Sequence, residues 1–436
     1  MILDHLKNYR DLYGITLVWL LLGAALPKLL AAGVVVVSYL LILRTRDLSK
    51  IFFSFLTILI FSDSRSRVFA FAETAKIGIV LLLLCFIIIN WEEFKNVPNK
   101  VFTFFLPFLF FAVTASIWSE NNLVSIQKSL SYSIVFFIVP LLFVRSNDEN
   151  SSFKRDLIVY FFLVLTAGLL VHLVLPNFTT LVGRYRGLLG NPNGLGIFLT
   201  VMFSIVYLIR NKIGKAFEED GFRYMFYLVF IVSLLLSGSR TSLISIVIFL
   251  LFNKLRYLSN GGAILLFIGL VFSYEILISN LPAMIEYLGF AEYFRLDTIE
   301  EGSGRFIAWN FAWIQIQNVF FAGGGFGHTE YIFKQFYNEL SRLGHQGNAH
   351  HSFLTIWLDT GLIGIVLFAL GLFRSVYKSI GASPYALPII FSILFSAFFE
   401  SWLAASLNPF TSLFLISLTL MMTKDSQNSN DQTADE

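Results

Sequence analysis

The chain has 436 residues, of which 56% are hydrophobic and 14% are charged, and its formal net charge is +3. A soluble globule of this composition would leave a large apolar surface in water, so the bilayer must be the solvent. The small net charge, without Lys and Arg clusters among aromatic residues, excludes a nucleic-acid partner. The single cysteine, Cys85, excludes an intrachain disulfide.

Long apolar runs follow one another along almost the whole chain. Helices are the expected spanning elements, because the runs are continuous rather than alternating with period two. At roughly 20 residues per crossing, the sequence predicts an all-α polytopic membrane protein with about 12–14 transmembrane helices. The candidate spans lie near residues 12–26, 28–44, 50–62, 75–91, 101–118, 126–144, 154–175, 190–210, 222–237, 241–257, 262–279, 350–373, 384–400 and 406–423.

The distribution of Lys and Arg predicts the orientation of these spans. With both termini in the cytoplasm, most positive charges fall inside, and every short inside loop carries at least two of them. The long segment 280–349 is then an extracytoplasmic loop that contains helices. The chain divides into N-terminal transmembrane helices (1–153), a core (154–376), C-terminal transmembrane helices (377–423) and a disordered cytoplasmic tail (424–436).

The segment GRYRGLLGNPNGLG, residues 183–196, ends a short outer loop and opens the next span. Arg184 and Arg186 offer planar forks of donors that suit a phosphate, and Asn191-Pro192-Asn193 forms a turn that can start a helix with Asn as its cap. The alternative is a simple turn whose arginines reach lipid headgroups. A second outer turn, SGSRTS at 237–242, holds Arg240 at the membrane boundary, where a structural salt bridge is the alternative to a ligand.

The long loop contains EGSGRFIAW at 301–309 and AGGGFGH at 322–328. Gly302-Ser303-Gly304 suggests a small anion nest beside Arg305, at the start of an amphipathic helix that carries Trp309 and Trp313. The glycine run at 323–325 has the composition of a nucleotide-binding loop. However, G-x-x-x-x-G-K and a surrounding βαβ pattern are absent, so no nucleotide site is expected.

The loop returns to the membrane at HQGNAHHSFL, which begins at His345. Asn348 is the expected helix N-cap, which places His350 and His351 in the first turn of the next span. The helix dipole and the nearby arginines would keep such a histidine neutral and able to act as a base. Two alternatives stay open: purely structural histidines, and a zinc site. The zinc site would use His328, His345, His350 and His351, although the H-E-x-x-H spacing is missing.

Taken together and in order, these motifs resemble those of the O-antigen ligase and O-antigen polymerase superfamily. The resemblance rests on R-G-x-x-x-N-P-N at 186–193, S-R at 239–240, GSGR-x-x-x-W at 302–309, G-x-G-F-G at 323–327 and A-H-x-S-x-L at 349–354 with glycines at 361 and 364. It covers about residues 154–376. His351 occupies a position where the family pattern usually has Asn.

The resemblance implies a membrane glycosyltransferase of the GT-C type in the bacterial inner membrane, with its active site in the periplasm. It would move a glycan from undecaprenyl diphosphate to a glycan or lipid A–core acceptor, without a metal or other cofactor. The absence of a D-x-D motif from every outer segment agrees with metal independence. By position, Arg186, Arg240 and Arg305 would contact the donor diphosphate, and His350 would lie near the acceptor hydroxyl.

The expected catalytic residues are therefore His350, Arg186 and Arg305, and the expected substrate-binding residues are Arg184, Arg240, Asn193, His351 and His345. Glu301, Asp297 and Glu330 are reserve candidates for the base. A lipid-linked oligosaccharide flippase or another transporter is the alternative function, although few charged residues lie deep within the spans. The sequence does not distinguish ligation, polymerisation and transfer to protein, which differ in their acceptor.

Overall fold

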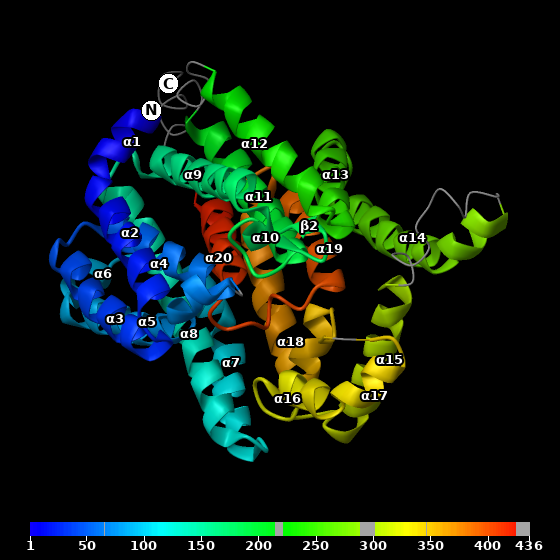
Figure 1. Cartoon of the computed structure of the whole chain (residues 1–436). Coiled ribbons are helices and arrows are strands. Elements are labelled where there is room, and N and C mark those ends of the chain that lie inside the picture. Colours follow the sequence, from blue (N-terminus) through cyan, green and yellow to red (C-terminus); the bar gives the residue numbers. More distant parts are fainter. Residues whose placement is uncertain (65, 214–220, 288–300, 346, 424–436) are drawn as a thin grey trace, which may run out of the picture.

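The computed structural model describes residues 1–64, 66–213, 221–287, 301–345 and 347–423 (Figure 1). This part of the chain forms 20 α-helices, two short 3-10 helices and one minimal hairpin of β1 (Thr180–Leu181) and β2 (Arg184–Tyr185). The predicted all-α membrane class is confirmed. The predicted tail 424–436 lies outside the described residues.

Each predicted span coincides with a helix, because a long apolar run in a bilayer can satisfy its backbone groups only within the helix itself. In chain order these are α2 (Arg10–Ala25), α3 (Lys28–Arg44), α4 (Leu48–Asp63), α5 (Ala70–Ile89), α7 (Lys100–Thr114), α8 (Asn122–Glu149), α9 (Phe153–Val174), α11 (Pro192–Ile213), α12 (Phe222–Ser237), α13 (Arg240–Lys254), α14 (Asn260–Tyr287), α18 (Ser352–Ile380), α19 (Ala386–Phe399) and α20 (Pro409–Met422).

Within the part of the chain that the structure describes, six helical segments are long and apolar enough to cross a membrane: Arg67–Ile89, Lys100–Trp118, α8, α9, Pro192–Asn211 and α18. Two of them combine an α-helix with a 3-10 turn, which is η1 (Arg67–Phe69) before α5 and η2 (Ala115–Trp118) after α7. Several other apolar helices are shorter, and α19 and α20 have only 14 residues each. A span count of 12–14 therefore stays a prediction.

The remaining helices are short or lie in the predicted outer loop. They are α1 (Ile2–Asn8), α6 (Trp91–Phe94), α10 (Pro176–Thr179), α15 (Glu301–Asn318), α16 (His328–Gln335) and α17 (Tyr337–Arg342). The last three confirm that the long loop contains helices. Because α15 begins at Glu301, Gly302-Ser303-Gly304 forms its first turn, and Trp309 and Trp313 follow on the same helix.

Helix α20 lies at the centre of the fold (Figure 1), and every residue from Pro409 to Met422 is buried. It packs against α4, α7, α8, α11 and α18. Helix α4 is similarly enclosed, with all residues from Ile51 to Phe61 buried. Because their side chains are enclosed by other helices, these two helices form the interior of the bundle that supports the polar loops.

The contacts between loops support the predicted alternation of spans. Loops predicted inside contact one another, as in the ion pairs Arg46–Glu93 and Lys50–Asp11 and the buried pair His5–Asp156. Loops predicted outside also contact one another, as in Gly190 N–H to Asp63 and Lys76 to the Leu407 carbonyl. The polar connections thus form two separate groups. Which group faces the periplasm stays a prediction.

Helix α18 is broken at Gly361, which has φ 67° and ψ −174°. The glycine-rich segment after α15 crosses the break: Gly324 and Gly325 donate their N–H groups to the carbonyls of Leu358 and Asp359, at 3.0 and 2.9 Å. Leu362 N–H in turn donates to the Phe320 carbonyl at 2.8 Å. The glycines at 323–325 therefore fasten the segment after α15 to α18.

Replacing Gly361 by alanine should destabilise the protein. A Cβ atom at this position would lie 2.3 Å from the Phe321 carbonyl oxygen, and the backbone conformation is nearly restricted to glycine. We expect Gly361→Ala to cost about 1–3 kcal/mol and to lower the unfolding midpoint in detergent. Gly269→Ala is the matched control, since a Cβ there meets nothing within 4 Å. Equal midpoints for the two variants would contradict the role of this break.

Candidate active site

The site begins with the loop that leads into α11. The loop closes through the β1–β2 hairpin, and Gly183 and Gly187 adopt positive φ values of 72° and 59°. Asn191 Oδ1 accepts the Gly194 N–H at 2.7 Å, and Pro192 is the first residue of α11. The predicted Asn cap followed by Pro is confirmed. This cap fixes the position of Asn193 on the first turn of the helix.

Arg184 connects this loop to the SGSR turn between α12 and α13. Its Nε donates to the Ser237 carbonyl at 2.9 Å, and its Nη2 donates to Asn193 Oδ1 at 3.0 Å. The turn is possible because Gly238 adopts a φ of 58°, and Arg240 then opens α13 as an exposed side chain. The two predicted arginine motifs are therefore parts of one polar surface.

Glu400 is the residue at which the separate segments meet. It directly follows α19 and is only 7% exposed. Its Oε1 accepts hydrogen bonds from Asn193 Nδ2 at 2.9 Å and from Arg305 Nη2 at 3.3 Å. Its Oε2 lies 3.2 Å from His350 Nδ1. One carboxylate thus holds α11, α15 and the segment before α18.

The surroundings of Glu400 keep it ionised. Burial by itself raises the pKa of a carboxyl, but the hydrogen bond from His350, the positive charge of Arg305 and the hydrogen bond from Asn193 lower it further than burial raises it. The net direction is a pKa below the ordinary glutamate value. A carboxylate only accepts hydrogen bonds, so a neutral His350 in this contact carries its proton on Nδ1, which leaves Nε2 as the nitrogen with a lone pair.

His350 lies before the helix rather than in its first turn. Helix α18 begins at Ser352, and His351 is its N-cap, with Nδ1 accepting the Leu354 N–H at 3.2 Å. The expectation that Asn348 would be the cap is wrong, because a histidine nitrogen satisfies the free N–H group instead. Asn348 Oδ1 accepts the His350 N–H at 3.0 Å, and His350 adopts a φ of 45°. Such a conformation is uncommon for a residue other than glycine and often marks functional sites.

His351 lies among aromatic rings, close to Trp309, Phe353 and Phe398. Burial lowers its pKa to about 4. Because this histidine is neutral and uses Nδ1 as a helix cap, it supports the fold next to the site. The two adjacent histidines therefore differ in environment: His350 contacts the buried carboxylate, and His351 contacts apolar rings.

Three other predicted site residues, Arg186, His345 and Arg240, belong to the segments that carry these contacts. Arg186 is 8% exposed and donates to the carbonyls of Gly190 and Phe178 at 3.2 and 3.0 Å, so it holds its own loop in shape. His345 is buried beside His350, with ring centroids 5.8 Å apart, and its Nε2 lies 3.1 Å from the Asn348 carbonyl. Arg240 is described above. Asp297 and the Glu301 side chain lie outside the described residues.

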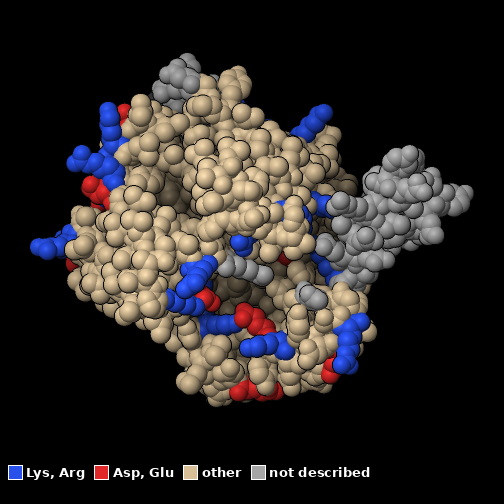
Figure 2. Space-filling view, viewed as in Figure 1, with Lys and Arg blue, Asp and Glu red and all other residues tan. Residues whose placement is uncertain are grey.

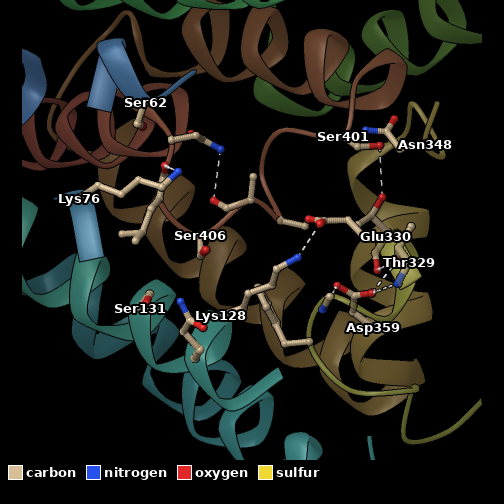
Figure 3. Close-up of a pocket in the computed structure, with 18 of the residues that line it drawn as sticks. Ser62, Lys76, Lys128, Ser131, Thr329, Glu330, Asn348, Asp359, Ser401 and Ser406 are labelled. Atoms are coloured by element: carbon tan, nitrogen blue, oxygen red, sulfur yellow. Dashed lines mark hydrogen bonds and ion pairs between the residues drawn. The ribbon is translucent and has the colours of Figure 1, made fainter. Parts of the chain in front are cut away.

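A cavity of about 410 Å³, lined by both polar and apolar residues, adjoins the site. It opens between the end of α4, the starts of α5, α8 and α16, the first turns of α18 and the segment 401–408. Charged side chains surround the hollow that is visible on this face of the molecule (Figure 2). Lys128 and Glu330 form an ion pair of 2.6 Å across the cavity, and Asn348 and Ser401 line it on the side of His350 (Figure 3).

Sequence reasoning missed Glu400 as a site residue. Its only local signal is an acid at the end of a strongly apolar run, and it lies outside the predicted core 154–376. No group of three or more His, Cys, Asp or Glu side chains among the residues that the structure describes has the arrangement of a metal site. The four histidines of the zinc alternative instead contact the partners described above or, for His328, the ring of Tyr331.

Residues 225–369, about a third of the chain, match the family model described as O-antigen ligase. The resemblance to the O-antigen ligase and polymerase superfamily is confirmed. The match includes Arg240, Arg305 and both adjacent histidines, and it indicates an O-antigen-ligase-like glycosyltransferase that acts on a lipid-linked glycan and an acceptor. No curated protein matched the chain.

Acidification should weaken the fold through His351. Its pKa in the folded protein, about 4, is below the 6.5 of a free histidine, so the unfolded chain binds more protons and stability is lost as the pH falls through this window. We expect a loss of about 1–3 kcal/mol between pH 7 and pH 4.5, seen as a lower unfolding midpoint in detergent. His351→Asn keeps a capping oxygen without a titrating group and should lose less. The same pH dependence in both proteins would refute this assignment.

Proposed function

We propose that the protein transfers a glycan from an undecaprenyl-diphosphate carrier to an acceptor sugar hydroxyl at the periplasmic face of the bacterial inner membrane. The observation that carries this proposal is the contact of Glu400 with Arg305 on one oxygen and with His350 on the other. A cationic side chain and a histidine with a fixed tautomer are thus held side by side, in a segment that matches the O-antigen ligase family.

The donor diphosphate is assigned to the arginine side of Glu400. Arg184 contacts Asn193, and Arg305 contacts Glu400. Arg240 is the last residue of the SGSR turn, three residues after Ser237, whose carbonyl accepts a hydrogen bond from Arg184. Guanidinium groups suit this task because they stay charged and present several donors in a plane. As the glycosidic bond breaks, its electron pair leaves with the diphosphate, and nearby arginines would stabilise that developing charge.

The acceptor is assigned to His350. Since Nδ1–H points to Glu400, Nε2 is free to take the proton of the acceptor hydroxyl while the acceptor oxygen bonds to the anomeric carbon. Displacement of the diphosphate from the opposite face of that carbon gives inversion of configuration. Glu400 acts as a positioning residue that fixes the tautomer and stabilises the imidazolium once it forms.

Alanine substitutions should separate the roles of the predicted residues. In vesicles with a lipid-linked donor, we expect His350→Ala to lower kcat by about 10²–10⁴-fold and Arg305→Ala by at least about 10²-fold. Arg186→Ala should also lose activity, mainly through a misplaced loop and a lower unfolding midpoint. Arg374→Ala is the control, because this exposed arginine belongs to a predicted inside loop.

Folded His350→Ala and Arg305→Ala proteins with normal transfer would overturn the site. Movement of unmodified lipid-linked glycan across the bilayer, without transfer to an acceptor, would instead support the flippase alternative.

Replacing Glu400 by glutamine should lower kcat more than it changes acceptor KM. The amide is nearly the same size, but it no longer fixes the His350 tautomer or balances the imidazolium. In other enzymes, the corresponding change beside a catalytic histidine costs about 10⁴-fold. We expect at least a hundredfold loss of kcat, with acceptor KM within about threefold. A purely structural role would lower the unfolding midpoint and the folded yield while kcat of the folded fraction stays unchanged.

A further inference from the structure

The cavity beside the site has both polar and apolar lining residues and belongs to the same loops that hold His350. Its lining offers uncharged hydrogen-bonding groups from Gln127, Ser131, Asn348, Ser401, Ser406 and Asn408. Phe326, Ile77 and Leu407 add apolar surface. A volume of about 410 Å³ falls within the usual range for small-molecule sites. Hydroxyl and amide groups beside apolar patches suit a sugar ring, which has hydroxyls at its edge and C–H groups on its faces.

The charges of the cavity disfavour a diphosphate. Four carboxylates line it, from Asp63, Glu73, Glu330 and Asp359, against two lysines, Lys76 and Lys128. Lys128 is paired with Glu330, and Lys76 donates to the Leu407 carbonyl at 3.1 Å. The formal balance is negative, so an anionic ligand would be repelled. No arginine is among the described lining residues.

Two of these carboxylates already accept hydrogen bonds from other groups of the protein. Asp63 Oδ2 accepts the Gly190 N–H at 2.8 Å. Asp359 accepts from Gly327 N–H at 2.8 Å and from both the N–H and the hydroxyl of Thr329 at 2.7 Å. These bonds give the cavity a fixed shape before any ligand arrives, which is a requirement for selective binding.

The cavity is connected to the proposed base by direct contacts. Asn348 Oδ1 accepts the His350 N–H, and Ser401 Oγ accepts the His351 N–H at 2.8 Å. Ser401 directly follows Glu400 in the chain. Its Oγ also accepts a hydrogen bond from the Thr355 hydroxyl at 3.2 Å. A molecule in the cavity therefore lies against the same backbone that positions His350 and Glu400, whereas Asn193 and Arg305 approach Glu400 from α11 and α15.

We propose that this cavity binds an uncharged sugar residue of the acceptor and directs one of its hydroxyl groups toward His350. This assignment rests on the proposed glycan transfer. It adds a substrate class that the arginine and histidine motifs do not specify: a neutral acceptor sugar, separated from the diphosphate of the donor by the Glu400 side chain.

The test fills the cavity without touching the arginines or His350. Purified protein in vesicles receives the producing strain's undecaprenyl-diphosphate-linked repeat unit as donor. The acceptor, either lipid A–core or a repeat-unit oligosaccharide from that strain, is then varied in concentration. Ser406→Trp and Ser131→Phe place bulk in the cavity, Gln127→Ala is a milder change, and Thr103→Trp, at an exposed position on α7, is the control.

We expect the two filling variants to raise acceptor KM at least about tenfold and Gln127→Ala to raise it a few-fold, with donor KM within about twofold of wild type. Thr103→Trp should match wild type. Unfolding midpoints identify a filling variant that has misfolded. In that case the acceptor KM of Gln127→Ala tests the proposal. An unchanged acceptor KM in the folded variants overturns the proposal. A rise in donor KM alone also overturns it, because the cavity would then hold the donor glycan.

Failure of the proposed function would look different. If the wild-type protein transfers no glycan to either acceptor, the enzymatic proposal fails, and saturation-transfer NMR with the neutral oligosaccharide still tests the cavity. Binding that is present in wild type and lost in Ser406→Trp supports a sugar site. Binding that persists in Ser406→Trp, or that is absent from wild type, overturns it.

Discussion

A single buried carboxylate, Glu400, connects segments that lie more than 200 residues apart in the chain. It accepts hydrogen bonds from Asn193 on α11 and Arg305 on α15, and it pairs with His350 before α18. A buried charge is costly unless it is paired and hydrogen-bonded, so the three partners and the carboxylate depend on one another. The geometry of the site is consequently a property of this network more than of any one loop.

The network is possible because the surrounding helices hold its members in place. The interior helices α4 and α20 are buried along most of their length, and the glycine-rich segment after α15 is hydrogen-bonded into the break in α18 at Gly361. That break fixes the loop that returns to the membrane, and the His351 cap fixes the start of α18. His350 lies between these two fastened points, where its left-handed backbone conformation is maintained by its neighbours.

Much of the fold could be predicted because the bilayer imposes a strong, local rule. A run of about 20 apolar residues has few alternatives to a helix, and every predicted span is helical. A helix start is also predictable where a capping side chain directly precedes a proline, as at Asn191-Pro192 before α11. The cap at His351 was missed because Asn is the commoner cap, and nothing in the sequence says which residue reaches the free N–H group of Leu354.

Glu400 could not be found from the sequence because its role depends on contacts across the fold. The arginines and histidines stand beside glycines and turns, which form recognisable patterns, whereas Glu400 ends an ordinary apolar helix. Similarly, Arg184 and Arg186 look interchangeable in the motif, yet the first contacts Asn193 and the second holds backbone carbonyls. Strand β2 contains Arg184 but ends at Tyr185, before Arg186, and the two side chains have different partners.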